Sequence, residues 1–161
     1  MATVIVALGS NKGDRKEEIA QARSFLSKLS CNKPTHAPVY ETEPIGPSDT
    51  YYFNTVTQIT TNHSPHELVD KLKAYEKARG RSEDDPRWSA RCIDLDIISY
   101  DDRIIKENGL VIPHKEYCKR LFVLKPLQDI KPRWKDPENH KSIDVLMAEA
   151  PNMEIYPLNG S

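Results

Sequence analysis

The sequence predicts an α+β protein, a ferredoxin-like βαββαβ sandwich whose antiparallel sheet carries helices on one face and is followed by C-terminal extras. Short runs rich in β-branched residues alternate with two stretches of helical apolar spacing, in the order strand, helix, strand, strand, helix, strand. The length of 161 residues suits one hydrophobic core, so residues 1–161 are expected to form a single domain. The second face of such a sheet would stay open for loops and a ligand.

The first half of the chain supplies one strand, one helix and two further strands. Thr3–Leu8 is a β-branched run typical of an interior strand. Asp14 follows a turn and is placed to cap a helix with apolar residues at helical spacing up to about Ser30. Residues 36–42 and 53–61 are expected as the next two strands. The proline-containing segment between them is either a binding loop or a plain surface loop.

The second half begins with a helix that has clear boundaries. Ser64 and Glu67 form a capping box with proline at the first helical position, and Gly80 is placed to close the helix. Glu76 would lie at the edge of its buried face. Cys92–Ile98 is typical of a buried strand. The remaining elements are expected, in chain order, as short strands over 104–105 and 110–112, a short helix over 115–120, an apolar packing segment over 121–127 and a helix over 142–149.

Composition excludes several classes of protein. The formal net charge is −1, so no overall field favours nucleic acid or an anionic membrane surface, and neither is expected as a partner. No apolar run reaches transmembrane length, and the apolar start lacks the basic region of a signal peptide. The three cysteines are widely spaced without a CxxC pair, which favours a reducing, cytoplasmic location over a disulfide framework or a zinc site.

Two aspartates on the 92–98 strand carry the chemistry. Asp94 and Asp96 alternate with apolar residues, so they share one face of the strand while the apolar side chains share the other. Neighbouring carboxylates repel each other, and hard oxygen ligands at this spacing suit Mg²⁺. Ion pairs with arginines such as Arg87 or Arg91 are the structural alternative.

An arginine-rich segment lies just before these aspartates. Arg79, Arg81, Arg87 and Arg91 are interleaved with acidic residues and with Trp88. A metal-binding pair beside several arginines is what a polyphosphate substrate requires, although a solvated loop with balanced charges would have the same composition. Loops over 46–51 and 82–90 are expected to close over bound substrates.

Several motifs together resemble one family. Arg87-Trp88-x-x-Arg91-x-Ile93-Asp94-Leu95-Asp96 is similar to the signature of the 6-hydroxymethyl-7,8-dihydropterin pyrophosphokinases. Matching motifs occur in the right order along essentially the whole chain: Ala7-Leu8-Gly9-Ser10-Asn11-x-Gly13-Asp14, Tyr40-x-Thr42-x-Pro44-Ile45-Gly46, Tyr52-Phe53-Asn54 and Val111-Ile112-Pro113-His114.

The resemblance implies a folate-pathway enzyme that transfers the β,γ-diphosphate of ATP to the hydroxymethyl group of a reduced pterin and releases AMP. It implies that Asp94 and Asp96 hold two Mg²⁺ ions and act in catalysis with Arg81 and Arg91, and that Glu76 supports the site. The residues implied to bind ATP are Lys73, Arg81, Arg87, Arg91, Ile97, His114, Lys115 and Arg120. Those implied to bind the pterin are Thr42, Glu43, Ile45, Tyr52, Asn54, Trp88, Asp94 and Phe122.

Three positions depart from the family pattern. Lys115 stands where an aromatic residue is common, Glu83 where a basic residue is common and Glu43 where proline is frequent. These departures bear on ATP affinity and loop closure rather than on the chemistry. Rival interpretations are another two-metal nucleotidyl- or phosphotransferase, a nucleic-acid module and an inactive relative. A monomer or weak dimer is expected.

Overall fold

A computed structural model describes residues 1–44, 50–80 and 92–158 of the chain. Within these residues six strands form one sheet in the order β5-β1-β4-β3-β8, and β2 also pairs with β4. Every pairing in this sheet is antiparallel. The strands are β1 (Ala2–Ser10), β2 (Thr35–His36), β3 (Tyr40–Thr42), β4 (Tyr52–Thr61), β5 (Asp94–Tyr100) and β8 (Ile155–Pro157). The antiparallel sheet that the sequence predicts is therefore confirmed.

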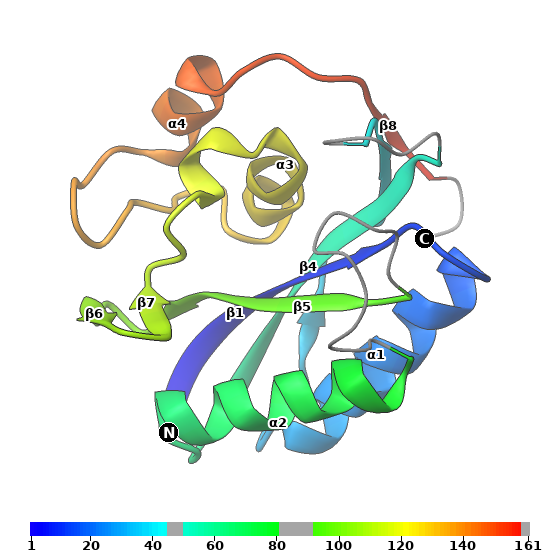
Figure 1. Ribbon diagram of the computed structural model, residues 1–161. Coiled ribbons are helices and arrows are strands. Elements are labelled where there is room, and N and C mark those ends of the chain that lie inside the picture. The colour runs from blue at the N-terminus through cyan, green and yellow to red at the C-terminus, as the bar shows by residue number, and fades with distance from the viewer. Residues whose placement is uncertain (45–49, 81–91, 159–161) are drawn as a thin grey trace.

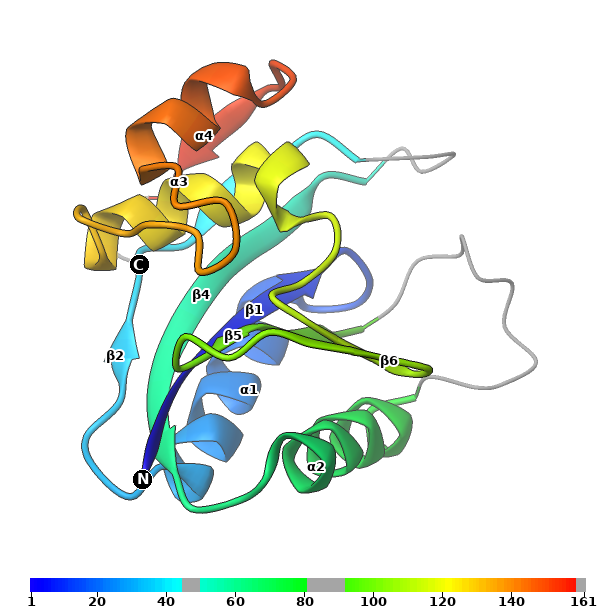
Figure 2. The same ribbon diagram turned by 90° about the vertical axis from the view of Figure 1, so that its left-hand side faces the viewer.

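Helices cover both faces of this sheet (Figures 1 and 2). On one face lie α1 (Arg15–Leu29) and α2 (Pro65–Ala78), and on the other α3 (Leu121–Ile130) and α4 (Ile143–Glu149). The alternation of side chains along β1 divides the core accordingly. Val4 packs in the cluster beneath α1 and α2, and Ile5 packs in the cluster beneath α3 and α4.

Both predicted helix starts are confirmed. The Asp14 carboxylate accepts a hydrogen bond from the backbone N–H of Glu17 at 3.1 Å, which satisfies one of the unpaired donors of the first turn of α1. Ser64 and Glu67 form the reciprocal capping box at the start of α2. Gly80 follows α2 with φ of +106°, a conformation that glycine adopts without steric cost.

The structure also departs from the sequence-based expectations at several elements. Residues 36–42 form two short strands, β2 and β3, because Ala37-Pro38-Val39 interrupts the pairing with β4. The apolar segment over 121–127 packs on the core as predicted and forms most of α3, whereas β8 was not expected. The second sheet face is only partly open, since α3 and α4 bury a second core against much of it.

A short hairpin and a turn of 3-10 helix lie between β5 and α3. The hairpin consists of β6 (Ile105–Glu107) and β7 (Leu110–Ile112), and η1 (Tyr117–Lys119) follows it. The backbone N–H of His114 donates to the carbonyl of Ile98 at 2.9 Å, which holds this connection against β5. Within the described parts of the chain, no helix has the length and apolar character needed to cross a membrane.

Candidate active site

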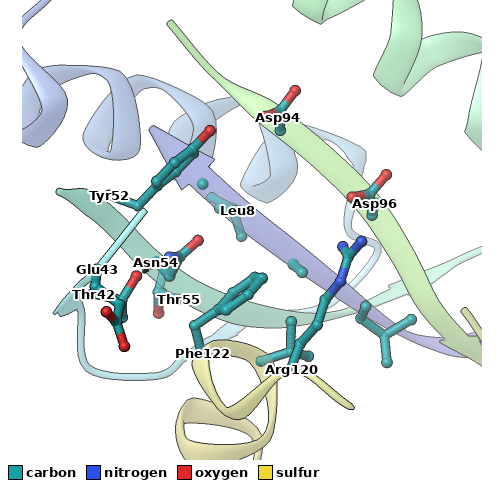
Figure 3. Close-up of a pocket in the computed structure, with 14 residues that line it drawn as sticks. Leu8, Thr42, Glu43, Tyr52, Asn54, Thr55, Asp94, Asp96, Arg120 and Phe122 are labelled. Carbon is teal, nitrogen blue, oxygen red and sulfur yellow. Dashed lines mark hydrogen bonds between the residues drawn. The ribbon is translucent and has the colours of Figure 1, made fainter. Parts of the chain in front are cut away.

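Asp94 and Asp96 lie on β5, at the edge of the sheet. The intervening Leu95 is fully buried on the face covered by α1 and α2, whereas both carboxylates project from the opposite face (Figure 3). The division of the two faces that the sequence predicts is confirmed. The Asp96 side chain is 39% exposed, so it remains open to a ligand from solvent.

Two side chains of α2 form hydrogen bonds with the backbone N–H and carbonyl of Leu95 at the outer edge of β5. The backbone N–H of Leu95 donates to Glu76 Oε1 at 2.6 Å, and Lys73 Nζ donates to the Leu95 carbonyl at 3.2 Å. An edge strand otherwise exposes such unpaired groups. Glu76 is 1% exposed, so it lies within the buried face of α2 rather than at its edge as expected. The backbone between the two aspartates is thereby tied to α2.

Lys73 also approaches the aspartate pair. Its Nζ lies 3.5 Å from Asp96 Oδ1 and 3.4 Å from Glu76 Oε1, so one ammonium group bridges an exposed carboxylate and a buried one. This contact partly neutralises the negative charge that accumulates on β5.

A first cavity of about 230 Å³ opens on the carboxylate face of the sheet (Figure 3). Six of the eight residues that the sequence associates with the pterin line it, and the other two, Ile45 and Trp88, fall outside the residues that the structure describes. The six lining residues are Thr42, Glu43, Tyr52, Asn54, Asp94 and Phe122. The structure thus brings together residues from β3, β4, β5 and α3.

The centre of this cavity is built around Gly9. Gly9 on β1 is the register partner of Asn54 on β4 and of Asp94 on β5. A Cβ atom at position 9 would lie 2.7 Å from Asn54 Oδ1, so only glycine leaves room for the amide. Asn54 Nδ2 in turn donates to Thr42 Oγ1 at 2.7 Å, a buried bond that fixes the orientation of the amide. The rings of Tyr52 and Phe122 flank this polar centre (Figure 3).

A second cavity of about 220 Å³ lies beside the first, between α2, β5 and the β6–β7 hairpin. Four residues that the sequence associates with ATP line it, namely Lys73, Ile97, His114 and Lys115. Asp96 lines both cavities and is the residue they share among those the structure describes. A ligand in either cavity therefore reaches the same carboxylate.

His114 is a neutral group in the second cavity. Burial lowers the pKa of His114 below its usual value more than the negative charge of Asp96 raises it. The backbone N–H of Glu116 donates to His114 Nδ1 at 3.1 Å, so the neutral ring carries its proton on Nε2. His114 can therefore donate one hydrogen bond from Nε2 to an oxygen of a ligand.

Arg120 lines the first cavity and not the second. The sequence associates it with ATP, but the structure places it in the lining of the first cavity, with its guanidinium 5.7 Å from the ring centroid of Phe122. Three further arginines of the predicted site, Arg81, Arg87 and Arg91, fall within the residues that the structure leaves undescribed.

The aspartate pair suits Mg²⁺ by its donor chemistry. Both groups supply hard carboxylate oxygens from one face of a rigid strand, and the described residues contain no group of three or more acidic, histidine or cysteine side chains that could enclose an ion. Magnesium is commonly held by one or two carboxylates and completed by water and substrate phosphates. Asp94 and Asp96 therefore fit an ion that binds together with a phosphate ligand.

Sequence reasoning missed some of the cavity walls. Gly9 belongs to a motif that the sequence singles out, but no role was assigned to it; a glycine at the end of a buried strand is itself a signal of close approach. Val111 and Leu110 of the hairpin line the second cavity, and their position depends on a fold that periodicity cannot predict.

Fold and site together define a small α+β protein in which two cavities on β5 share one carboxylate, Asp96, with Asp94 beside it in the first cavity. Residues 5–132 match the model of the 7,8-dihydro-6-hydroxymethylpterin-pyrophosphokinase (HPPK) family. This match covers more than half of the chain, and the chain belongs to that family.

Curated relatives agree with the family match. A Pseudomonas aeruginosa protein named 2-amino-4-hydroxy-6-hydroxymethyldihydropteridine pyrophosphokinase is 35% identical over 160 residues, which are 98% of each chain. A Haemophilus influenzae protein of the same name is 39% identical over 132 residues, 81% of this chain and 82% of that one. An Arabidopsis thaliana "Folate synthesis bifunctional protein" is 38% identical over 128 residues, 79% of this chain, but the chain spans only 26% of its length.

Solved structures agree with the fold. The crystal structure of wild-type Plasmodium falciparum HPPK-DHPS with SDX-DHP aligns with a TM-score of 0.66, covering 92% of this chain and 43% of that chain. The sequence identity is 14%, so this likeness bears on the fold alone.

Proposed function

We propose that this protein is a pyrophosphokinase of folate biosynthesis, which transfers the β,γ-diphosphate of ATP to the hydroxymethyl group of 6-hydroxymethyl-7,8-dihydropterin and releases AMP. Membership of the family and the names of relatives matched over their full length support this function. The structural observation that carries it is the pair of cavities that meet at Asp96, because the reaction must bring two substrates to one metal-binding carboxylate.

The first cavity is proposed to bind the pterin. A flat heterocycle would stack against the rings of Tyr52 and Phe122, and the Asn54 amide, held by Thr42, would hydrogen-bond its polar edge. The hydroxymethyl group would then point toward Asp94 on the same cavity wall.

The second cavity is proposed to bind ATP. Ile97 would contact the adenine, His114 would donate a hydrogen bond from Nε2, and Lys115 would supply a positive charge for the phosphates in place of the aromatic residue common in the family. The hydroxymethyl oxygen would attack the β-phosphorus in line with the departing AMP, so the triphosphate must extend across Asp96 toward the first cavity.

Asp94 and Asp96 are proposed to hold two Mg²⁺ ions. When bound, these ions would neutralise the triphosphate and polarise the attacked β-phosphorus. The attachment of Leu95 to Glu76 holds the strand between the carboxylates, which limits the reorganisation needed when ATP arrives. Arg81 and Arg91 are proposed to stabilise charge on the transferred group, and Arg87 and Trp88 to contact ATP and the pterin. Ile45 is proposed to line the pterin site.

Further proposals concern the fold arrangement, the domain organisation, the cellular location and the oligomeric state. We infer that the strand order β5-β1-β4-β3, with α1 and α2 on one face, is a ferredoxin-like arrangement to which α3, α4 and β8 are added. A single domain, a cytoplasmic location and a monomer or weak dimer are proposed with it. Sedimentation equilibrium of the full chain would test the last of these.

The experiment that tests the function follows nucleotide products. The protein is incubated with ATP, Mg²⁺ and 6-hydroxymethyl-7,8-dihydropterin, and AMP should appear together with the pterin diphosphate. Release of ADP or of inorganic pyrophosphate instead would contradict the proposal. Asp96→Ala should abolish AMP release while circular dichroism shows an intact fold.

Asp102→Ala is a matched control for that variant. Asp102 is an exposed carboxylate in the turn after β5 and lines neither proposed substrate cavity. The Asp102→Ala variant should release AMP at the wild-type rate. Robust turnover by Asp96→Ala would refute the assignment of the metal site.

A further inference from the structure

The strand β8 lies outside the residues that match the family model. The family match ends at residue 132, whereas β8 covers Ile155–Pro157. It nevertheless pairs with β3, with Thr42 opposite Ile155 and Tyr40 opposite Pro157. Without β8, the backbone of β3 that faces it would be an unpaired sheet edge next to the first cavity. The C-terminal segment is therefore part of the structure that shapes this cavity.

Glu154, the residue just before β8, makes two reciprocal bonds with Glu43. The backbone N–H of Glu43 donates to the carbonyl of Glu154 at 3.1 Å, and the backbone N–H of Glu154 donates to Glu43 Oε1 at 2.8 Å. Glu43 lines the first cavity next to Thr42. A proline at position 43 would lack both the donated N–H and the accepting carboxylate, so both bonds depend on the glutamate present here.

The side chain of Glu154 reaches a second residue of the same rim. The Tyr51 hydroxyl donates to Glu154 Oε2, and Tyr51 directly precedes Tyr52, whose ring lines the cavity. Hydrogen bonding to this carboxylate raises the pKa of Tyr51 to about 12, which is consistent with a phenol that donates its proton to Glu154. Glu154 thus contacts the chain at two points, one at the end of β3 and one at the start of β4.

Arg15 holds Tyr51 from the other side. Its Nη1 donates to the Tyr51 carbonyl at 2.7 Å and to Glu41 Oε2 at 3.1 Å, and its guanidinium lies 4.1 Å from the ring centroid of Phe53. The backbone of Tyr51 is therefore anchored to α1 and its hydroxyl to the C-terminal segment. The direction in which Tyr52 enters the cavity depends on both anchors.

We propose that Glu154 is a positioning residue for the first cavity: through Glu43 and Tyr51 it sets the rim on which the pterin ring is bound. Glu154 itself lines neither cavity, so it acts through its neighbours and not by contact with substrate. The inference deepens the proposed function and rests on the assignment of this cavity to the pterin. It extends the substrate-binding machinery to a segment beyond the residues of the family match.

The test measures binding of the oxidised, fluorescent analogue 6-hydroxymethylpterin to the full chain, together with steady-state kinetics. Glu154→Gln removes the charge that accepts the Tyr51 hydrogen bond, and Tyr51→Phe removes its donor. Each should weaken pterin binding and raise the KM for the pterin by roughly two- to fivefold, the usual scale for a lost hydrogen bond to an exposed charged group. The KM for ATP and the kcat at saturating pterin should stay within about twofold of wild type.

Two controls match these variants. Glu149→Gln removes a carboxylate of α4 that pairs with Lys141, and Tyr156→Phe removes a hydroxyl from an exposed residue of β8 itself. Both should bind the pterin like wild type. The double variant Glu154→Gln/Tyr51→Phe should bind the pterin as well as the single variant with the lower pterin affinity, because both substitutions remove the same bond.

Amide hydrogen exchange separates this inference from the proposed function. Exchange at the Glu43 amide, which donates to the backbone carbonyl of Glu154, should be faster in Glu154→Gln than in wild type without any ligand, because the weakened side-chain bond to Tyr51 holds that carbonyl less firmly. Failure of the wild type to bind pterin would overturn the proposed function, and the exchange at Glu43 would still decide whether Glu154 positions the rim. Wild-type pterin affinity in both variants, or an equal rise in the KM for ATP, would overturn the inference.

Discussion

The backbone N–H of Leu95 donates to Oε1 of the buried Glu76 at 2.6 Å. This bond joins the last turn of α2 to the outer edge of β5, at the residue between Asp94 and Asp96. Because β5 has no strand on that side within the described sheet, a side chain takes the part of a neighbouring strand. The position of both aspartates therefore depends on a residue of a different element.

Removing this acceptor should cost stability. In Glu76→Ala the Leu95 amide stays buried without its partner, and we expect the free energy of unfolding to fall by about 1–3 kcal/mol. Glu76→Gln keeps an oxygen acceptor and should lose much less. Urea denaturation followed by circular dichroism measures both variants. Asp70→Ala, which removes an exposed carboxylate of the same helix, is the control and should leave the midpoint unchanged.

Much of the fold could be predicted because its signals are local. The caps at Asp14 and Ser64 and the alternation around Asp94 and Asp96 depend on neighbouring residues, and the structure has all of them. The secondary structure of residues 121–127 could not be predicted, because an apolar run of that length suits either a helix or a strand. β8 was missed because a three-residue segment that ends in proline is too short to show a strand pattern, and its pairing with β3 is a tertiary contact.

The candidate site, like the fold, could be predicted from the sequence only in part. The motifs predicted which residues gather in the first cavity, but not that Arg120 would line it beside Phe122. The burial of Glu76 was underestimated, because periodicity along α2 cannot show that the free edge of β5 supplies a hydrogen-bond partner. Such contacts join residues far apart in the chain, which a single sequence does not reveal.

Lys73 should compete with a metal ion for Asp96. Its ammonium lies 3.5 Å from Asp96 Oδ1, and with the two side chains 49% and 39% exposed the interaction is that of charges close to water. Replacing it in Lys73→Met should tighten Mn²⁺ binding about fivefold, since a repulsion of ~1 kcal/mol is removed. Titration of the nucleotide-free protein, followed by electron paramagnetic resonance of free Mn²⁺, measures the change. Lys71→Met, on the exposed side of the same helix, should bind Mn²⁺ like wild type, and weaker binding by Lys73→Met would contradict this expectation.

Asp136 should contribute stability that is lost in acid. Burial acts to raise the pKa of Asp136, but hydrogen bonds from the Tyr117 hydroxyl and from the backbone N–H groups of Asn139 and Glu138 outweigh it and lower the pKa. A carboxyl whose pKa is lower in the folded state stabilises the fold above its unfolded pKa of about 4 and loses that contribution as the pH falls further.

Asp136→Asn should therefore unfold more easily than wild type at pH 7, by about 1–3 kcal/mol for weakened hydrogen bonds to a charged group. The difference should shrink as the pH falls below about 4. Thermal unfolding from pH 7 to pH 3.5 measures it, with the exposed Asp102→Asn as the control. A difference that stays constant over this range would mean that the charge of Asp136 has no part in it.

Gly9→Ala should damage the first cavity selectively. The added Cβ would lie 2.7 Å from Asn54 Oδ1, closer than a real contact allows, so the amide must turn away from its bond to Thr42. Because Asn54 is proposed to hydrogen-bond the pterin, we expect the KM for the pterin to rise about tenfold or more, the equivalent of one lost buried hydrogen bond and the strain of moving the amide.

Gly9 does not line the second cavity, so the KM for ATP should change little in Gly9→Ala. Ser10→Ala is the neighbouring control: its hydroxyl is buried without a hydrogen-bond partner among the described residues, and its loss should leave the KM for the pterin as it is. Wild-type pterin affinity in Gly9→Ala would show that the Asn54 amide is not fixed by this close approach. An equal loss of ATP affinity would instead mean that the substitution disturbs β1 and β5 as a whole, because Gly9 is also the register partner of Asp94.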